Sequence, residues 1–544
     1  MKPLDLHFIQ RCGEHSWLSP TEIQMLEQQH RAGVDLATLV VKSGFMTEAD
    51  LYSRFAQYAG VPFLKREELP QALGAAHGLL PAETQVQLNV LPLGHSGGVL
   101  QLATGTLAFE TVEQLVFKRL SFRTQFSLVS PAILRLHLQS LHSNPEAAFQ
   151  AEVLRLSKSQ GQTASLEPFS NLLLRFAVAE RATDIHIAPN GSLLQVYFRI
   201  DGVMQPMVAL PSWFARYVSF VKVLADMDIS EQRMPQDGSF NLSINGVPYT
   251  VRVSTIVTTF GERLALRLLC ESSETPDVVA LGYTQEAADV LQRVAAEPNG
   301  LIVVTGPTGS GKSSTLHAML RMTDLIGRNV LTVEDPVEYA LPMSGQTQVN
   351  KKAGYDFQRA LRHFLRHDPD VILLGEMRDP ETAKAAVDAA ATGHLVLSTL
   401  HVTSTAGVPN RLISMGLNAM SLAENLRCVI SQRLVRRLCW HCHQRGPLSE
   451  TDQRWLGVSS ADGGLRVGCP HCRGTGYLGR LPVYEILRVT PAVRQCIQSG
   501  GSADDLRLVL EAGDFVSMLG CAAQHVVRAH TDVDEVERVL GGRL

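Results

Sequence analysis

The sequence has no apolar run close to the ~20 consecutive residues that a helix needs to cross a bilayer. Its opening residues, Met1 to Asp5, also lack the apolar core of a secretory signal peptide. We therefore expect a cytoplasmic protein, which a partner could still hold at a membrane.

The sequence also lacks an excess of charge of one sign, because the formal net charge is -4 over 544 residues. This balance gives no global electrostatic reason to expect nucleic acid as a partner. One local basic cluster is interpreted as a solvated helix face. Hydrophobic residues make up 45% of the chain and charged residues 19%, which favours globular cores over disorder, in about three or four domains. The basic cluster consists of Arg427, Arg433, Arg436 and Arg437.

Cysteine is sparse, with nine residues in the whole chain. An odd number in a long chain without a signal peptide argues against a disulfide framework. Four of the nine form two Cys-x-x-Cys pairs, and four thiolates at this spacing suit a tetrahedral structural Zn²⁺. A redox-active Cys-x-x-Cys is the alternative, and the second identical pair disfavours it. The predicted zinc ligands are Cys439, Cys442, Cys469 and Cys472.

The most specific signal in the chain is a phosphate-binding loop between a predicted strand and a predicted helix. The apolar run Leu301–Thr305 ends in Gly-Pro-Thr-Gly-Ser-Gly-Lys-Ser, which is the G-x-x-x-x-G-K-S pattern in the setting that it requires. Glycines let backbone N–H groups curl around a polyphosphate, Lys312 can neutralise the β- and γ-phosphates, and the Ser313 hydroxyl can bind Mg²⁺. A glycine-rich surface loop is the alternative, and the flanking elements disfavour it. The predicted binding residues for ATP or GTP are Gly306, Pro307, Thr308, Gly309, Ser310, Gly311, Lys312, Ser313 and Ser314.

A nucleotide hydrolase also needs a carboxylate at a strand end, to order Mg²⁺ or the attacking water. Glu376 closely follows the apolar run Val371–Leu374 and is interpreted as this group. Gly375 stands where many such ATPases carry aspartate, so other groups must complete the metal shell. A second strand-like run ends in acids and supplies two further candidates. The candidate carboxylates are Glu376, Glu338 and Glu334.

Two histidines flank the buried strand predicted at Leu395–Leu397. His394 precedes this strand and His401 follows it. A lone histidine is more often a satisfied structural group. Two beside a nucleotide site are candidates for sensing the γ-phosphate.

The pattern of predicted elements indicates an α/β protein of several domains. Strands alternate with helices around the phosphate loop, which predicts a doubly wound parallel sheet with nucleotide at the strand carboxyl ends. Upstream, strand-like runs meet at Asp201-Gly202 and Asn245-Gly246, which predict hairpin turns in an α+β domain. The expected divisions are a small α/β domain (1–142), a linker (143–165), the α+β domain (166–276), the nucleotide-binding domain (280–430), a tetracysteine module (431–482) and a helical region (483–544).

These motifs resemble, in content and order, those of the type II secretion and type IV pilus assembly ATPases. The resemblance runs from about residue 166 to residue 490. The segments that resemble the Walker A motif, Asp box, Walker B motif and His box are Gly306–Ser313, Thr332–Glu338, Asp368–Asp379 and Thr392–His401. The segments that resemble the family's PAS-like second N-terminal domain are Asp184–Ile187, Arg199–Gly202, Pro235–Gly238, Arg252–Thr255 and Gly261–Arg263.

The resemblance implies a hexameric ring of RecA-like domains that bind ATP with Mg²⁺. It also implies that the PAS-like domains clamp the ATP against the RecA-like domains. It implies that arginines of the PAS-like domain contact phosphate, and that the cysteine pairs hold Zn²⁺ in an insert that pilus retraction ATPases lack. The implied function is a motor ATPase that drives pseudopilus assembly for type II secretion. A type IV pilus extension ATPase stays open, because the sequence does not separate the two systems. A slow-turnover scaffold stays open because Val402–Ala406 departs from the family's Thr-Asn-Asp-Ala. The arginines are Arg252, Arg263 and Arg267.

Asp35–Gln57 resembles the N-terminal domain with which secretion ATPases dock on an inner-membrane partner. It carries two amphipathic helical patterns separated by Gly44, the second starting at Thr47-Glu48. The implied partners are further copies of the chain, an inner-membrane platform protein and a membrane anchor protein with a cytoplasmic domain. Some relatives bind cyclic di-GMP through Arg-Leu-Gly; here Asp35-Leu-Ala37 would set an acid against a phosphate, which disfavours that ligand.

Overall fold

The computed structural model describes residues 6–543 except 16, 32–35, 66–67, 70–78, 108, 143, 159–164, 245–246 and 271–276. The chain divides into two compact units, which we call the first unit (Met1–Glu274) and the second unit (Thr275–Leu544). Among the described residues, no helix has both the length and the apolar composition to cross a membrane.

The first unit begins with short helices, which include the two predicted from the sequence. Thr47 begins the second of these by accepting a hydrogen bond from the Asp50 amide, and Gly44 lies between them with a φ of 72°. Both predicted helices are thus confirmed, while Asp35 lies outside the described residues. The helices are α1 (Leu6–Glu14), α2 (Pro20–Arg31), α3 (Leu36–Lys42), α4 (Glu48–Ala59) and α5 (Ala82–Leu88).

A three-stranded sheet follows, in the order β1-β2-β3. The first pair of strands is antiparallel, and the second is parallel because a helix crosses between β2 and β3. The strand predicted at Val99–Thr104 is β2, and its Leu100 and Leu102 are fully buried. The elements are β1 (Val90–Ser96), β2 (Val99–Thr104), α6 (Phe109–Leu120), β3 (Arg123–Leu128) and α7 (Pro131–His142).

The segment predicted to be a linker contains a helix, α8 (Pro145–Lys158). Its Phe149 and Leu156 are buried, and the Phe149 ring lies 5.4 Å from that of Phe169 on α9 (Glu167–Ala179). The linker prediction is wrong here because two apolar residues seven positions apart share one helix face. This spacing indicates a helix with a buried face, although the polar composition of the segment is typical of a linker.

The rest of the first unit is a six-stranded antiparallel sheet in the order β6-β5-β4-β9-β8-β7. Asp201 and Gly202 join β5 to β6 with φ of 49° and 83°, as a two-residue hairpin turn requires. The predicted turn at 245–246 lies outside the described residues. The elements are β4 (Ala182–Asn190), β5 (Leu193–Ile200), β6 (Val203–Pro211), α10 (Arg216–Leu224), β7 (Gln236–Ile244), β8 (Val247–Thr258) and β9 (Gly261–Cys270).

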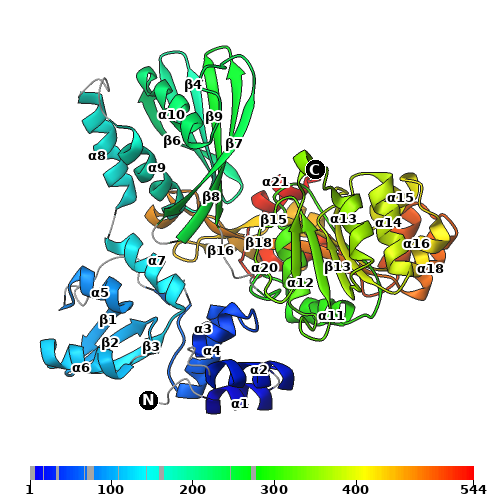
Figure 1. Cartoon of the computed structure of the whole chain (residues 1–544), viewed down its shortest axis with the longest axis horizontal. Helices are drawn as coiled ribbons and strands as arrows, with labels where there is room; N and C mark the ends of the chain where they lie inside the picture. Colours follow the sequence, from blue (N-terminus) through cyan, green and yellow to red (C-terminus); the bar gives the residue numbers. More distant parts are fainter. Residues whose placement is uncertain are drawn as a thin grey trace. The chain divides into compact units, whose positions relative to one another are not determined.

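The second unit is built on a seven-stranded sheet in the order β12-β11-β13-β14-β10-β15-β18 (Figure 1). All neighbouring pairs are parallel except β15 with β18, so the predicted parallel strands are confirmed. The strands are β10 (Gly300–Thr305), β11 (Val330–Glu334), β12 (Gly345–Gln348), β13 (Val371–Leu374), β14 (Leu395–Leu400), β15 (Leu426–Leu438) and β18 (Tyr477–Arg488).

Helices cover both faces of this sheet. Along β10, Ile302 and Val304 pack into one core and Leu301 and Val303 into the other, because successive side chains of a strand point to opposite faces. All four side chains are fully buried, as in a doubly wound fold. The helices are α11 (Gln285–Ala295), α12 (Lys312–Leu320), α13 (Phe357–Phe364), α14 (Pro380–Ala391), α15 (Gly407–Ser414), α16 (Ala419–Asn425), α18 (Pro491–Gln498), α19 (Ala503–Glu511), α20 (Met518–Val527) and α21 (Val533–Leu540).

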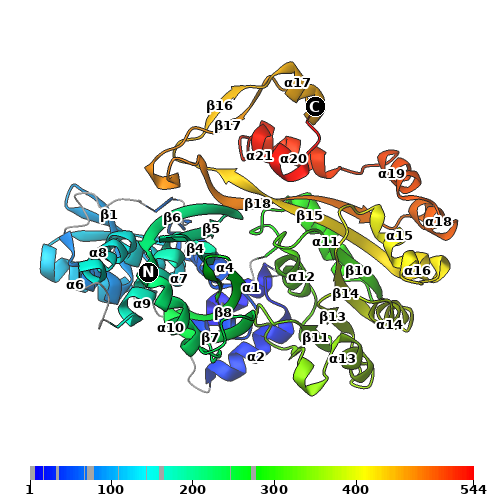
Figure 2. The same ribbon diagram turned by 90° about the horizontal axis from the view of Figure 1, so that it is seen from above.

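The two longest strands of the second unit, β15 and β18, run side by side from the sheet into the cysteine-bearing insert (Figure 2). The boundaries expected at residues 430/431 and 482/483 fall inside these strands, so the insert shares a continuous backbone with the nucleotide-binding sheet. The insert also contains β16 (Gln444–Pro447), α17 (Glu450–Leu456) and β17 (Asp462–Leu465).

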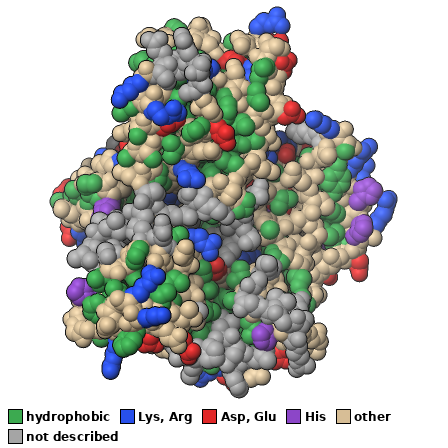
Figure 3. All heavy atoms as spheres, turned by 60° about the vertical axis from the view of Figure 1, so that its left-hand side comes forward, with side chains coloured by type: hydrophobic (Ala, Val, Ile, Leu, Met, Phe, Trp, Pro, Cys, Tyr) green, Lys and Arg blue, Asp and Glu red, His purple; other side chains and the backbone are tan. Residues whose placement is uncertain are grey.

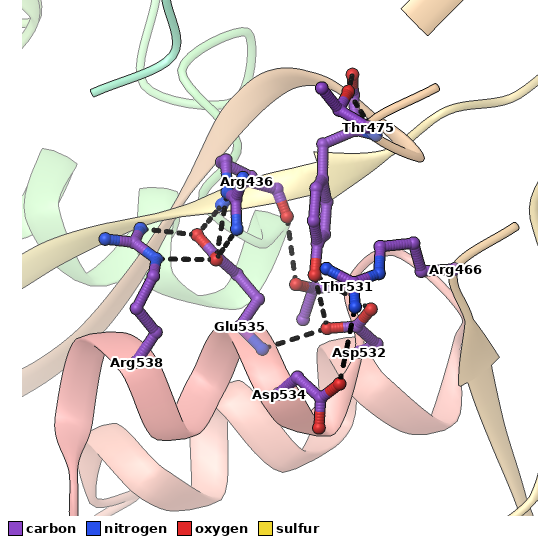
Figure 4. A network of polar contacts seen from close by, with 9 residues as sticks. Arg436, Arg466, Thr475, Thr531, Asp532, Asp534, Glu535 and Arg538 are labelled. Carbon is purple, nitrogen blue, oxygen red and sulfur yellow. Dashed lines mark hydrogen bonds and ion pairs between the residues drawn. The ribbon is translucent and has the colours of Figure 1, made fainter. Parts of the chain in front are cut away.

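The basic cluster lies on β15, so its assignment to a solvated helix face is wrong. Arg436 donates through Nε and Nη2 to one oxygen of the fully buried Glu535 carboxylate on α21, and Arg538 donates to both oxygens (Figure 4). Arg433 donates to the Val539 carbonyl. These arginines therefore fasten the C-terminal helix to the sheet. On the face drawn in Figure 3, acidic and basic side chains are interspersed, in keeping with the balanced charge of the chain.

Candidate functional site

The phosphate-binding loop lies between the carboxyl end of β10 and the start of α12, so the predicted strand–turn–helix arrangement is present. Gly306, Gly309 and Gly311 have φ of 147°, 77° and 86°. A Cβ atom added to Gly306 would lie 2.4 Å from the Gln432 carbonyl oxygen, which no side chain tolerates. The loop is thus a cradle of backbone amides that glycine alone can form, and it suits a polyphosphate.

Lys312 is the first residue of α12 and turns back over the loop. Its Nζ donates to the carbonyl oxygens of Gly306 and Pro307, both at 3.0 Å. Burial lowers the pKa of Lys312, while the charges of Glu376 and Glu338 act to raise it. Two of the three predicted carboxylates therefore act electrostatically on this lysine.

Glu376 follows β13 at the same edge of the sheet and is 9% exposed. Its Oε2 lies 2.6 Å from Nε of Arg378 and 3.6 Å from Nε2 of His401. The sequence analysis did not predict Arg378, although it stands only two positions after the acid. A buried carboxylate between a guanidinium and an imidazole is held in a fixed orientation. In that orientation it can position a water molecule and accept its proton.

Glu334 ends β11 and is buried, but protein donors occupy both of its carboxylate oxygens. His317 Nε2 lies 2.8 Å from one oxygen. Thr332 Oγ1 at 2.8 Å and Gln346 Nε2 at 3.2 Å donate to the other. His317 belongs to α12, so Glu334 ties the helix that follows the phosphate loop to the neighbouring strand.

The prediction that His394 lies beside the phosphate loop is wrong. His394 precedes β14, and its carbonyl accepts a hydrogen bond from Gly300, the first residue of β10. The loop follows the last residue of that strand, so His394 lies at the opposite edge of the sheet. Its ring contacts the Ala389 carbonyl at 2.9 Å and thus closes the end of α14. Only His401 is brought to the candidate site.

The position that often carries an acidic residue, Gly375, has little space around it. A Cβ atom there would lie 3.2 Å from both the Val333 carbonyl oxygen and the Phe357 ring. An aspartate would therefore need its neighbours to shift.

The three candidate arginines lie on one face of the six-stranded sheet of the first unit. Arg252 and Arg267 are direct cross-strand partners on β8 and β9, and Arg263 is four residues before Arg267 on the same strand. Arg267 Nε lies 2.8 Å from the Asp184 carboxylate, an ion pair within the sheet. A cationic row of this kind suits an anion, although Arg267 already has an acidic partner.

The four predicted zinc ligands come together in the insert. Their sulfur atoms all lie within 4.8 Å of one another, with Cys439–Cys469, Cys442–Cys472 and Cys469–Cys472 separations of 3.9, 3.8 and 3.7 Å. Tetrahedral Zn²⁺ with Zn–S bonds of ~2.3 Å places its ligands about 3.8 Å apart, so the donor set fits zinc.

The electrostatics around one of these thiols also favour metal binding. Burial acts to raise the pKa of Cys472, but hydrogen bonds from the amide N–H groups of Cys469 and Gly476, together with those of the Cys469 and Cys442 thiols, outweigh it and bring the pKa to about 7. A thiolate is the form that binds metal.

A doubly covered parallel sheet, a glycine-rich loop at the carboxyl end of one strand and a buried glutamate at the end of another define a P-loop ATPase. The defining sequence pattern of the family "Type II/IV secretion system protein" matches residues 159–538. The chain belongs to this family.

Individual relatives agree with this assignment. The chain is 44% identical over 381 residues to a putative type II secretion system protein E of Escherichia coli, covering 69% of this chain and 76% of the relative. It is 35% identical over 529 residues to the type IV pilus assembly ATPase PilB of Thermus thermophilus, covering 94% of this chain. The chain spans 59% of that relative's length. The fold matches that of the Yersinia pseudotuberculosis ATPase DotB, with a TM-score of 0.52 and 21% identity over 69% of this chain and 94% of that one.

Proposed function

We propose that the chain is a Mg²⁺-dependent motor ATPase that drives pseudopilus assembly for type II protein secretion. The observation that carries the proposal is that Lys312 and Glu376 follow β10 and β13, at the carboxyl ends of parallel strands, and that the charges of Glu376 and Glu338 act on this lysine. In this account Lys312 and the loop amides bind the phosphates. Glu376 orients the attacking water, with His401 and Arg378 holding its carboxylate in place.

Ser313 and Glu338 are the groups that we assign to magnesium, which would supply charge neutralisation on the β- and γ-phosphates. Glu334 is a weaker candidate for this shell, because its oxygens are taken by His317, Thr332 and Gln346. We therefore propose that Glu334 holds α12 in place, and through α12 also the phosphate-binding loop.

We further propose that the active form is a homohexamer, in which the domain at residues 166–276 is PAS-like and adds arginines to the nucleotide site. Of the three candidates, Arg252 and Arg263 are favoured because Arg267 is paired with Asp184. An arginine added on closure can raise the rate of phosphoryl transfer by ~10³–10⁵ in comparable enzymes. Zn²⁺ on the four cysteines would stiffen the insert, without a part in the chemistry.

The proposed partners are an inner-membrane platform protein and a membrane anchor protein with a cytoplasmic domain, which would hold the chain in the cytoplasm at the inner membrane. The test is ATPase activity of the purified chain measured against its oligomeric state, with and without the cytoplasmic domain of the anchor. The proposal predicts magnesium-dependent turnover that rises with hexamer formation. A chain that binds ATP but turns it over equally slowly in every state is the scaffold alternative.

A type IV pilus extension ATPase is the second candidate, because the relative that matches 94% of this chain is a pilus assembly ATPase. The chemistry at the site would be the same. Complementation separates the two: the gene should restore secretion of exoproteins in a strain lacking its type II ATPase. Restoration of surface pili alone would favour the pilus reading.

A further inference from the structure

One side chain under the phosphate-binding loop, Gln432 on β15, was not singled out by the sequence and makes three hydrogen bonds in the core. β10 ends at Thr305, which pairs with Ser431 on β15, so Gln432 is the first residue of β15 beyond the end of β10. It is 2% exposed. Its backbone carbonyl closes the space beside Gly306.

The amide group of Gln432 has a partner at each end. Its Nε2 donates to the Ser310 carbonyl at 2.6 Å. Its Oε1 accepts from the Tyr283 hydroxyl at 2.7 Å and from Thr315 Oγ1 at 2.8 Å. Thr315 belongs to α12, so one amide joins the loop, the helix that follows it and the neighbouring strand. The Ser310 hydroxyl oxygen, also buried, has no partner among the described residues.

We propose that Gln432 is a positioning residue for nucleotide binding, which fixes the Ser310 carbonyl and so aims the amides of the phosphate-binding loop. The proposal rests on the proposed nucleotide-binding function of that loop. A backbone amide binds phosphate well only when its direction is set before the ligand arrives. The peptide group that follows Ser310 carries both this carbonyl and the Gly311 N–H, so holding one end orients the other.

This arrangement depends on an amide side chain at position 432. Glutamate has nearly the same shape and can still accept from Tyr283 and Thr315, but its ionised carboxylate cannot donate to the Ser310 carbonyl. Methionine retains most of the volume, carries no charge and makes none of the three bonds. Gln432→Glu and Gln432→Met therefore remove the same loop contact by different means.

A matched control is present in the same unit. Gln453 on α17 also donates through Nε2 to a backbone carbonyl, that of Leu448, at 2.9 Å in the insert. Gln453→Glu makes the same chemical change far along the chain from the loop. The melting temperature of this variant measures how the loss of such a bond changes stability when the phosphate-binding loop is not altered.

The experiment is calorimetric titration of full-length protein with ADP and with ATP in the presence of magnesium, together with the kcat and KM of hydrolysis and the melting temperature. Both Gln432 variants should raise the nucleotide Kd about ten-fold. Gln453→Glu should leave the Kd within two-fold of the wild type, even where its melting temperature falls.

The outcomes are distinct. If the wild-type chain binds no nucleotide, the proposed function itself is contradicted. A wild-type chain that binds, beside a folded Gln432 variant with unchanged Kd, would overturn only the positioning role. If neither variant attains the wild-type circular dichroism spectrum, Gln432 is a determinant of folding and the positioning role is overturned as well.

Discussion

Thr305 holds the backbone of Val402 through a single hydroxyl group. Its oxygen lies 2.6 Å from the Val402 carbonyl oxygen and accepts from the Val402 amide at 2.9 Å. It also lies 3.0 Å from the Leu400 carbonyl oxygen. His401 stands between these two residues, and the phosphate-binding loop begins at the residue after Thr305. One side chain thus connects the start of the loop to the turn that carries the histidine beside Glu376.

Replacing Thr305 with valine should disturb catalysis more than binding. The shape of the side chain is retained, but the turn around His401 loses its hydrogen bonds and the Val402 amide is left without this partner. We expect kcat to fall about ten-fold with a change of less than two-fold in nucleotide Kd, measured by steady-state hydrolysis and calorimetry. Thr305→Ser retains the hydroxyl and should remain near the wild type. Equal kcat for the valine and serine variants would contradict this role.

Glu376→Gln should separate binding from hydrolysis. The amide has the shape of the carboxylate but cannot accept a proton from water, so turnover should fall by at least about 10²-fold while ATP still binds. Single-turnover hydrolysis and nucleotide titration measure the two effects. Glu381→Gln, an exposed acid in the first turn of α14, is the control for loss of one negative charge. Loss of ATP binding in Glu376→Gln would show that the carboxylate belongs to the binding step instead.

The tetracysteine site should hold one zinc ion per chain. Cys439→Ser or Cys472→Ser removes one of four ligands, so zinc content should fall and the insert should become protease-sensitive. Elemental analysis and limited proteolysis check this. Cys496→Ser, at a cysteine outside the cluster, should retain full zinc content. Wild-type protein that contains no zinc after purification without chelators would refute the assignment.

A buried histidine in the second unit, His525, should make the protein less stable in mild acid. Burial lowers the pKa of His525 from 6.5 to about 4, and the charges of His530 and Arg528 act in the same direction. Between these two pKa values the unfolded chain binds more protons than the folded one. The contribution of this group to the free energy of unfolding is therefore complete above pH ~6.5 and is lost towards pH ~4, by up to about 3 kcal/mol.

His525→Gln should therefore flatten the acid limb of a plot of melting temperature against pH. His363→Gln, which alters an exposed histidine on α13, is the control and should leave the limb unchanged. If His525→Gln follows the wild-type curve between pH 7.5 and pH 5, the histidine does not contribute to acid sensitivity.

The sequence predicted those parts of the site that are local in the chain. The phosphate-binding loop, its strand and its helix follow one another, and Glu376 comes two residues after the end of β13, so periodicity and glycine positions were sufficient. The clustering of the four cysteines was predicted for the same reason, since each Cys-x-x-Cys pair is local and the two pairs have the same spacing.

The errors and omissions have a common cause, which is that the sequence does not show which distant elements become neighbours. Gln432 and Thr305 matter because β15 and β14 lie on either side of β10, an order set by the sheet and absent from local patterns. His394 was misplaced because closeness to a strand does not say which end faces the site. Arg436 was assigned to a helix face because its buried partner, Glu535, lies 99 residues away.

The account depends most directly on nucleotide binding by the phosphate loop, and Lys312→Ala tests it. The variant removes the cation that the proposal places on the phosphates, while Lys384→Ala removes an exposed lysine from α14 as a control. Calorimetry with ATP and magnesium should show binding by the wild type and the Lys384 variant, and a Kd at least about 10²-fold weaker for Lys312→Ala. Unchanged binding by Lys312→Ala, or no binding by the wild type, would contradict the account.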